Sequence, residues 1–202
     1  TQSTGTTITN NAGGIITATK HAINGSHTAT SNTTITNSGK IYITEAKSAL
    51  TFNSATGTTI TNNSGGEIYI DTTATDTSPA ILIGANSSIT NSRQIRNDSD
   101  NTEKSIKFTG DNTTLTNNSG GSIIGWVMNN NKTGITVTNS GQISSSDNNY
   151  TLGGTASSTG TYTNNQGGVI SNTSTGEAVR LGTSSTFTNS GIVQTANHSK
   201  NA

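Results

Sequence analysis

Acidic side chains near the middle of the chain are the first candidates for chemistry. Asp71 and Asp76 lie in one polar segment, and Asp98, Asp100 and Glu103 lie in the next. Carboxylates that line a groove can cleave glycosidic bonds, one acting as the acid and the other as base or nucleophile. The second group also has a calcium-like oxygen spacing, but it lacks the glycine and the full loop of an EF-hand. We expect a solvated loop here and keep a weak calcium site as the alternative.

Histidines and glycine pairs do not complete a catalytic motif. His21, His27 and His198 have no Asp, Glu or Cys at the spacing of a metal site or a catalytic triad. The glycine pairs mark turns that lead into strands, whereas a phosphate-binding loop leads into a helix. We therefore expect a protein without enzymatic activity, metal or cofactor, and we expect the histidines to be solvated.

Threonine pairs separated by one residue form a regular candidate surface. If each pair lies on the outward side of a strand, its hydroxyls are about 7 Å apart along the strand and about 4.8 Å from those of the next strand. Such an array resembles the ice-binding face of β-solenoid antifreeze proteins, so ice binding is an alternative function. A simpler explanation is that threonine suits a half-exposed strand. The pairs are Thr7 and Thr9, Thr34 and Thr36, Thr59 and Thr61, Ser88 and Thr90, Thr114 and Thr116, Thr136 and Thr138, Thr161 and Thr163, and Thr186 and Thr188.

A third candidate is a stripe of aromatic and long side chains. Alternation along the strands predicts that Tyr42, Tyr69, Arg96 and Ile124 point outward at equivalent positions of successive repeats, and that Trp126 and Met128 continue the stripe along the same repeat as Ile124. Exposed aromatic rings could stack on sugar rings or bind a protein partner. The alternatives are a ladder that stabilises neighbouring strands, or a Trp126 that turns inward. The predicted members are Tyr42, Tyr69, Arg96, Ile124, Trp126 and Met128.

A short sequence motif that occurs eight times positions these candidates. It consists of an apolar residue, then Thr-Asn, then a turn, then Ile or Val. Its asparagines are separated by 22 to 29 residues. Repeats of this length indicate a solenoid, in which each unit buries its apolar face by stacking on the next. We expect each asparagine to bond its equivalent in the next unit and so to form an internal ladder. The asparagines are Asn10, Asn37, Asn62, Asn91, Asn117, Asn139, Asn164 and Asn189.

The turn after each asparagine has two lengths that alternate along the chain. The next inward apolar residue follows after six residues in the long form, as from Asn62 to Ile68, and after four in the short form, as from Asn37 to Ile41. A difference of two keeps the inward side chains inward, whereas a difference of one would reverse the faces of the second strand. The turns therefore separate two strands with a defined interior.

A third strand with the same alternation is visible in most repeats, as at Leu50 and Phe52 or at Val179 and Leu181. The fifth repeat is compressed and lacks a clear third strand. The prediction is an all-β fold, a single-stranded right-handed parallel β-helix of about eight rungs of roughly 25 residues with three strands per rung. Such a rod would be on the order of 40 Å long.

The composition agrees with a thin, elongated core. Of the 202 residues, 27% are hydrophobic and 10% are charged, whereas an ordinary globular domain is roughly 45–50% apolar. Zero net charge argues against a nucleic-acid partner, and no apolar run approaches the roughly 20 residues of a membrane span. We expect residues 1–202 to form one domain. Because neither end shows a polar cap, we expect it to be a fragment of a longer surface protein.

The segment from Thr34 to Ile41, echoed from Thr136 to Ile143, resembles the degenerate repeats of bacterial autotransporter passenger domains. The likeness extends over essentially the whole chain. Such passengers stand on the cell as rods and act in adhesion or self-association, so the resemblance implies an extracellular protein of the bacterial surface. We expect a non-enzymatic structural and adhesive segment whose partners are a host-cell surface, a glycan or another copy. Ice binding and a tailspike-like glycan hydrolase or lyase are the alternatives.

Overall fold

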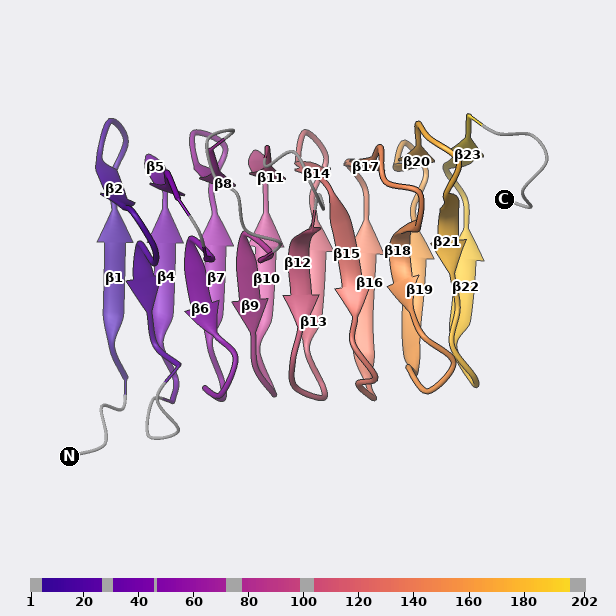
Figure 1. Cartoon of the computed structure of the whole chain (residues 1–202), viewed down its shortest axis with the longest axis horizontal. Coiled ribbons are helices and arrows are strands. Elements are labelled where there is room, and N and C mark those ends of the chain that lie inside the picture. The colour runs from indigo at the N-terminus through magenta and orange to yellow at the C-terminus, as the bar shows by residue number, and fades with distance from the viewer. Residues whose placement is uncertain (1–4, 27–30, 46, 72–77, 99–103, 197–202) are drawn as a thin grey trace.

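Three parallel β-sheets run the length of the molecule. The computed structural model describes residues 5–26, 31–45, 47–71, 78–98 and 104–196. Within these ranges every regular element is a β-strand, and successive strands of the chain fall in successive sheets. The chain therefore winds as a coil whose turns stack along one axis, with the first and last turns at opposite ends (Figure 1).

Each sheet collects one strand from each turn of the coil. The first sheet contains β1 (Thr7–Asn10), β4 (Thr34–Asn37), β7 (Thr59–Asn62), β10 (Ser88–Asn91), β13 (Thr114–Asn117), β16 (Ile135–Asn139), β19 (Gly160–Asn164) and β22 (Thr186–Asn189). The second contains β2 (Ile15–Ala18), β5 (Lys40–Ile43), β8 (Glu67–Ile70), β11 (Gln94–Asn97), β14 (Ser122–Ile124), β17 (Gln142–Ser145), β20 (Val169–Asn172) and β23 (Ile192–Thr195). The third contains β3 (Ile23–Asn24), β6 (Leu50–Phe52), β9 (Ile81–Ile83), β12 (Lys104–Phe108), β15 (Trp126–Asn129), β18 (Tyr150–Gly154) and β21 (Glu177–Arg180).

This arrangement is a right-handed parallel β-helix, and it confirms the predicted fold class. We call each turn of the coil a rung and number the rungs from the N-terminus. Rungs one to seven each supply three strands, and rung eight supplies β22 and β23 to the first two sheets. The Thr-Asn motif of every repeat lies in the first sheet, so the sequence period and the structural period are the same.

Side chains at equivalent positions of the repeat form continuous columns. In the first sheet Ile35 lies opposite Ile8 and Ile60, and in the second sheet Ile41 lies opposite Ile16 and Ile68. The alternation of long and short turns leaves this register intact, as a difference of two residues requires. The inward hydrophobic residues of rungs two to six are almost completely buried, and with Tyr162 and Ile170 of rung seven they form one hydrophobic core.

The predicted asparagine ladder lines one corner of the core. In every step the Nδ2 of one asparagine donates to the Oδ1 of the next, at 2.8 Å. The same Nδ2 also donates to turn carbonyls, as Asn62 does to Gly66 at 3.0 Å and to Gln94 at 3.1 Å. Because buried polar groups are costly unless they are bonded, the ladder favours one register between neighbouring rungs.

The compressed fifth repeat is where the sequence prediction of strands is wrong. A third strand is present there as β15, separated from β14 by the single residue Gly125. Gly125 has a φ of 119°, which a residue with a side chain rarely adopts, and this permits the one-residue corner. Leu181, predicted to be inward, follows the end of β21 and is 42% exposed.

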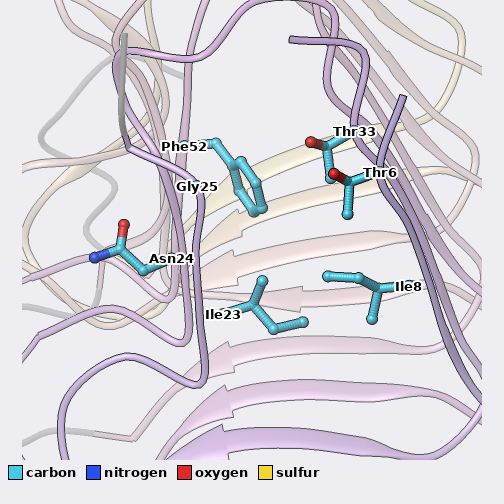
Figure 2. Close-up of a pocket in the computed structure, with 7 residues that line it drawn as sticks. All are labelled: Thr6, Ile8, Ile23, Asn24, Gly25, Thr33 and Phe52. Carbon is cyan, nitrogen blue, oxygen red and sulfur yellow. The ribbon is translucent and has the colours of Figure 1, made fainter. Parts of the chain in front are cut away.

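The first rung leaves a hollow at its end of the core. Figure 2 shows Ile8 and Ile23 pointing toward each other from opposite walls of the coil, while Asn24 points away. Gly25 leaves room for the next rung, because a Cβ there would lie 2.2 Å from a ring carbon of Phe52. A volume of about 210 Å³ remains open between these side chains.

Candidate functional site

The outer face of the second sheet carries the aromatic stripe in the register that was predicted. Tyr42, Tyr69, Arg96 and Ile124 lie opposite one another on β5, β8, β11 and β14. The rings of Tyr42 and Tyr69 are parallel within 2° and their centroids are 4.8 Å apart. The Arg96 guanidinium lies 4.1 Å from the centroid of the Tyr69 ring and also pairs with the Asp98 carboxylate. We call these four residues the outer stripe.

Stacking leaves the members of the outer stripe unequally accessible. Tyr69 is only 9% exposed, because Tyr42 covers one face of its ring and Arg96 the other. Burial raises the pKa of the Tyr69 hydroxyl, and the neighbouring Tyr42 raises it further. Tyr42 is half-buried, and the residue opposite it on the side away from Tyr69 is the exposed Thr17. The accessible ring face of the stripe is therefore that of Tyr42.

Trp126 does not continue the outer stripe, and the expectation that it is exposed is wrong. It lies on β15 in the third sheet and is 5% exposed. Its ring packs against that of Tyr150, with centroids 5.4 Å apart and planes 31° apart. Met128 also lies on β15, half-buried and opposite Lys107 and Gly153. Trp126 is therefore buried against its neighbours at this corner, but it lies outside the hydrophobic core cluster.

A second column of rings and cations, which the sequence interpretation missed, runs along this corner. The Lys104 Nζ lies 5.6 Å from the centroid of the Trp126 ring, and the Arg180 guanidinium lies 4.8 Å from that of Tyr150. Arg180 also donates to Glu177 at 2.5 Å. Burial raises the pKa of Tyr150 to about 12, although Arg180 opposes the shift. We call Lys104, Trp126, Tyr150 and Arg180 the corner column.

The sequence contains one signal for the corner column. From Asn117 to Asn139 the repeat is 22 residues long, the shortest of all, so rung five has too few residues for three strands and a corner loop. The short repeat indicates that rung five differs from its neighbours, but it predicts neither Trp126 nor Tyr150 as a member of the column.

The threonine pairs form two ladders on the outer face of the first sheet. Thr7 lies opposite Thr34 and Thr9 opposite Thr36, and the same register continues through all eight strands with Ser88 as the only exception to threonine. None of these side chains is buried. The predicted array of hydroxyls is therefore present as a geometric feature.

The two threonine ladders differ in accessibility. The second threonine of each pair is half-buried throughout rungs two to seven, whereas the first is fully exposed in rungs three, five and seven. In rung eight Thr188, which lies opposite Thr163, is exposed because no further rung covers it. The half-buried members are Thr36, Thr61, Thr90, Thr116, Thr138 and Thr163, and the exposed first members of those three rungs are Thr59, Thr114 and Thr161.

The acidic segments contribute less than their sequence suggests. Asp98 pairs with Arg96, while Asp76, Asp100 and Glu103 lie outside the described residues. The described part of the chain brings no three His, Asp or Glu side chains together as metal ligands. The calcium and hydrolase alternatives remain predictions, because both depend in part on acidic residues outside the described ranges.

One of the three histidines lies within the described residues. His21 is half-buried, and its Nδ1 lies 2.8 Å from the Thr51 Oγ1. His27 and His198 lie outside the described residues.

In the described ranges no helix is long and apolar enough to cross a membrane.

Comparison with protein-family models, curated proteins and solved structures finds no match to this chain. The class that the fold defines is the parallel β-helix, and any function has to be argued from the surfaces described above.

Proposed function

We propose that this chain is an extracellular, non-enzymatic β-helix of a bacterial surface protein, with a structural and adhesive role. The observation that carries the proposal is the unbroken asparagine ladder, which links rung to rung at 2.8 Å from Asn10 to Asn189. A coil tied in this way at every step resists bending and slippage. It suits a rod that holds a contact surface away from the cell.

The second sheet supplies the proposed contact surface. In rungs one and six to eight its outward column carries small or polar side chains, namely Thr17, Ser144, Ser171 and Gln194. Rungs two to five carry the outer stripe instead, which combines apolar area with a cation. Aromatic residues and arginine are the side chains most enriched where proteins bind partners. The partners we propose are a host-cell surface, its glycans or another copy of the chain.

The experiment measures attachment of protein-coated beads to cultured epithelial cells. We expect wild-type beads to attach and the triple variant Tyr42→Ser, Arg96→Ser, Ile124→Ser to attach about tenfold less. The matched control Thr36→Ser, Thr90→Ser, Thr138→Ser alters the first sheet and should attach as the wild type does. Wild-type beads that do not attach would overturn the adhesive role. Equal attachment of both variants would show that the contact surface does not lie on the second sheet.

Ice binding remains a second proposal, supported by the two threonine ladders. A flat array of hydroxyls and methyl groups at the spacing of a parallel sheet, about 4.8 Å between strands, could order water against ice. Thermal hysteresis of the purified protein tests it, with Thr61→Tyr and Thr90→Tyr placing bulky rings in the middle of the array. Hysteresis that these substitutions abolish would favour ice binding over adhesion. No hysteresis in the wild type would remove the proposal.

A further inference from the structure

We propose that a pyranose ring of a neutral glycan binds at the first two rungs of the second sheet, stacked on Tyr42 above Thr17. This inference rests on the proposed adhesive function and names the ligand class and the residues that would hold it. It concerns a single place on the outer stripe, the one where a ring face is accessible.

The geometry of the stripe singles out Tyr42. Tyr69 is enclosed by Tyr42 on one side and by Arg96 on the other, so neither face of its ring can receive a ligand. Tyr42 is enclosed on one side only. On the other side its partner in the sheet is Thr17, an exposed residue with a much shorter side chain. The outer part of the Tyr42 ring therefore projects beyond Thr17 and forms a ledge.

A hollow adjoins this ledge on the same face. It has a volume of about 190 Å³ and is lined by glycines of three successive turns together with Ile15, Ser38 and Lys40. Ile15 and Lys40 precede Thr17 and Tyr42 by two residues, so they point to the same side of the sheet. The hollow therefore lies beside the ledge, on the same face of the sheet.

The side chains around the ledge match both the apolar C–H face and the hydroxyl groups of a sugar ring. The Tyr42 ring and the 62% exposed Ile15 offer apolar area for the C–H face of a pyranose. The Thr17 hydroxyl can donate to and accept from sugar hydroxyls. The Lys40 Nζ lies 3.9 Å from a Glu67 carboxylate oxygen, and this pair offers both a donor and an acceptor while its charges balance. A neutral sugar fits this surface better than an acidic one for that reason.

The experiment titrates ¹⁵N-labelled protein with methyl β-D-galactopyranoside and follows the backbone amide shifts. Galactose is used because its axial hydroxyl leaves three C–H groups together on one face of the ring. This apolar face can stack on the Tyr42 ring. We expect saturable shifts at Thr17, Lys40 and Tyr42. Tyr42→Phe should bind within about twofold of wild type, because the ring remains, whereas Tyr42→Ala should bind at least about tenfold more weakly.

The decisive variant is Thr17→Arg, which places a guanidinium over the accessible face of Tyr42, as Arg96 covers Tyr69, without offering a new ring face. It should abolish the saturable shifts without lowering the urea midpoint, so the loss cannot come from unfolding. Thr36→Arg makes the same change on the first sheet and should leave binding intact. Absence of saturable shifts in the wild type, or their persistence in Thr17→Arg, would overturn the inference. Bead attachment that survives Thr17→Arg would overturn it while leaving the adhesive function in place.

Discussion

Asn91 shows what a single side chain contributes to the stability of the coil. It is completely buried, accepts from Asn62 Nδ2 and donates to Asn117 Oδ1, each at 2.8 Å. Asn91→Ala removes both bonds and leaves buried polar groups without partners, so we expect a loss of about 2–3 kcal/mol in the free energy of unfolding. Urea denaturation followed by circular dichroism measures it.

Asn118 provides the control for Asn91. Its Nδ2 donates to the Ser92 Oγ at 2.9 Å, but the side chain is only half-buried at the outside of the turn. We expect Asn118→Ala to cost less than about 1 kcal/mol, because water can replace its partner. Equal losses in the two variants would contradict a special role for the ladder.

The raised pKa of Tyr150 predicts that the folded protein becomes less stable at alkaline pH. Its pKa is raised to about 12 in the folded protein from a value of 10.0, chiefly by burial. A raised pKa means that the unfolded chain releases this proton first, so its contribution is intact below about pH 10 and is lost as the pH rises toward 12. We expect the urea midpoint to fall between pH 10 and 12, and Tyr150→Phe to reduce that fall. A fall of the same size in the variant would exclude Tyr150 as its source.

At the scale of elements, the length of each turn decides the register of the strand that follows it. Removing Asn63 and Gly65 together converts the long turn Asn62-Asn63-Ser64-Gly65-Gly66 into the short form found at Asn37-Ser38-Gly39. We expect this double deletion to fold normally and to lose about 1–2 kcal/mol, because Asn63 no longer donates from Nδ2 to the Ser38 Oγ at 2.9 Å or accepts from the Gly66 amide at 2.9 Å.

The single deletion of Gly65 is the matched test of this explanation. It would shift the strand after the turn by one residue and direct Ile68 toward solvent. We expect a much lower urea midpoint, together with loss of the native amide spectrum around rungs two to four. A single deletion tolerated as well as the double one would show that parity does not control the register.

At the scale of the whole molecule, each rung depends on the neighbours that cover it. Phe108 in rung four is completely buried, whereas Phe187 in rung eight has a covering rung on one side only and is half-exposed. We expect Phe108→Ala to cost about 3–5 kcal/mol and Phe187→Ala about 1–2 kcal/mol. Hydrogen exchange should show the second variant losing protection only in the last rungs. Similar losses in both variants would contradict this nearest-neighbour description.

Much of the architecture can be predicted from the sequence, because every rung of a solenoid needs the same kind of residue at the same position. The Ile8 column, the turn parity and the asparagine ladder each follow from one position observed eight times. The outer stripe is predictable as far as Ile124 for the same reason. Prediction fails at rung five, where Trp126 has no equivalent in other repeats and the chain turns on Gly125 alone.

The sequence by itself determined the period, the number of rungs and the direction in which the side chains of the first two sheets leave their strands. These are local properties, because alternation along an extended backbone needs no knowledge of distant residues. Only the tertiary structure decided which outward side chains are covered, as when Arg96 closes over Tyr69, the Trp126 ring packs against Tyr150, and Thr17 leaves a face of Tyr42 open. Coverage depends on the lengths of side chains and loops in adjacent rungs, about 25 residues away along the chain.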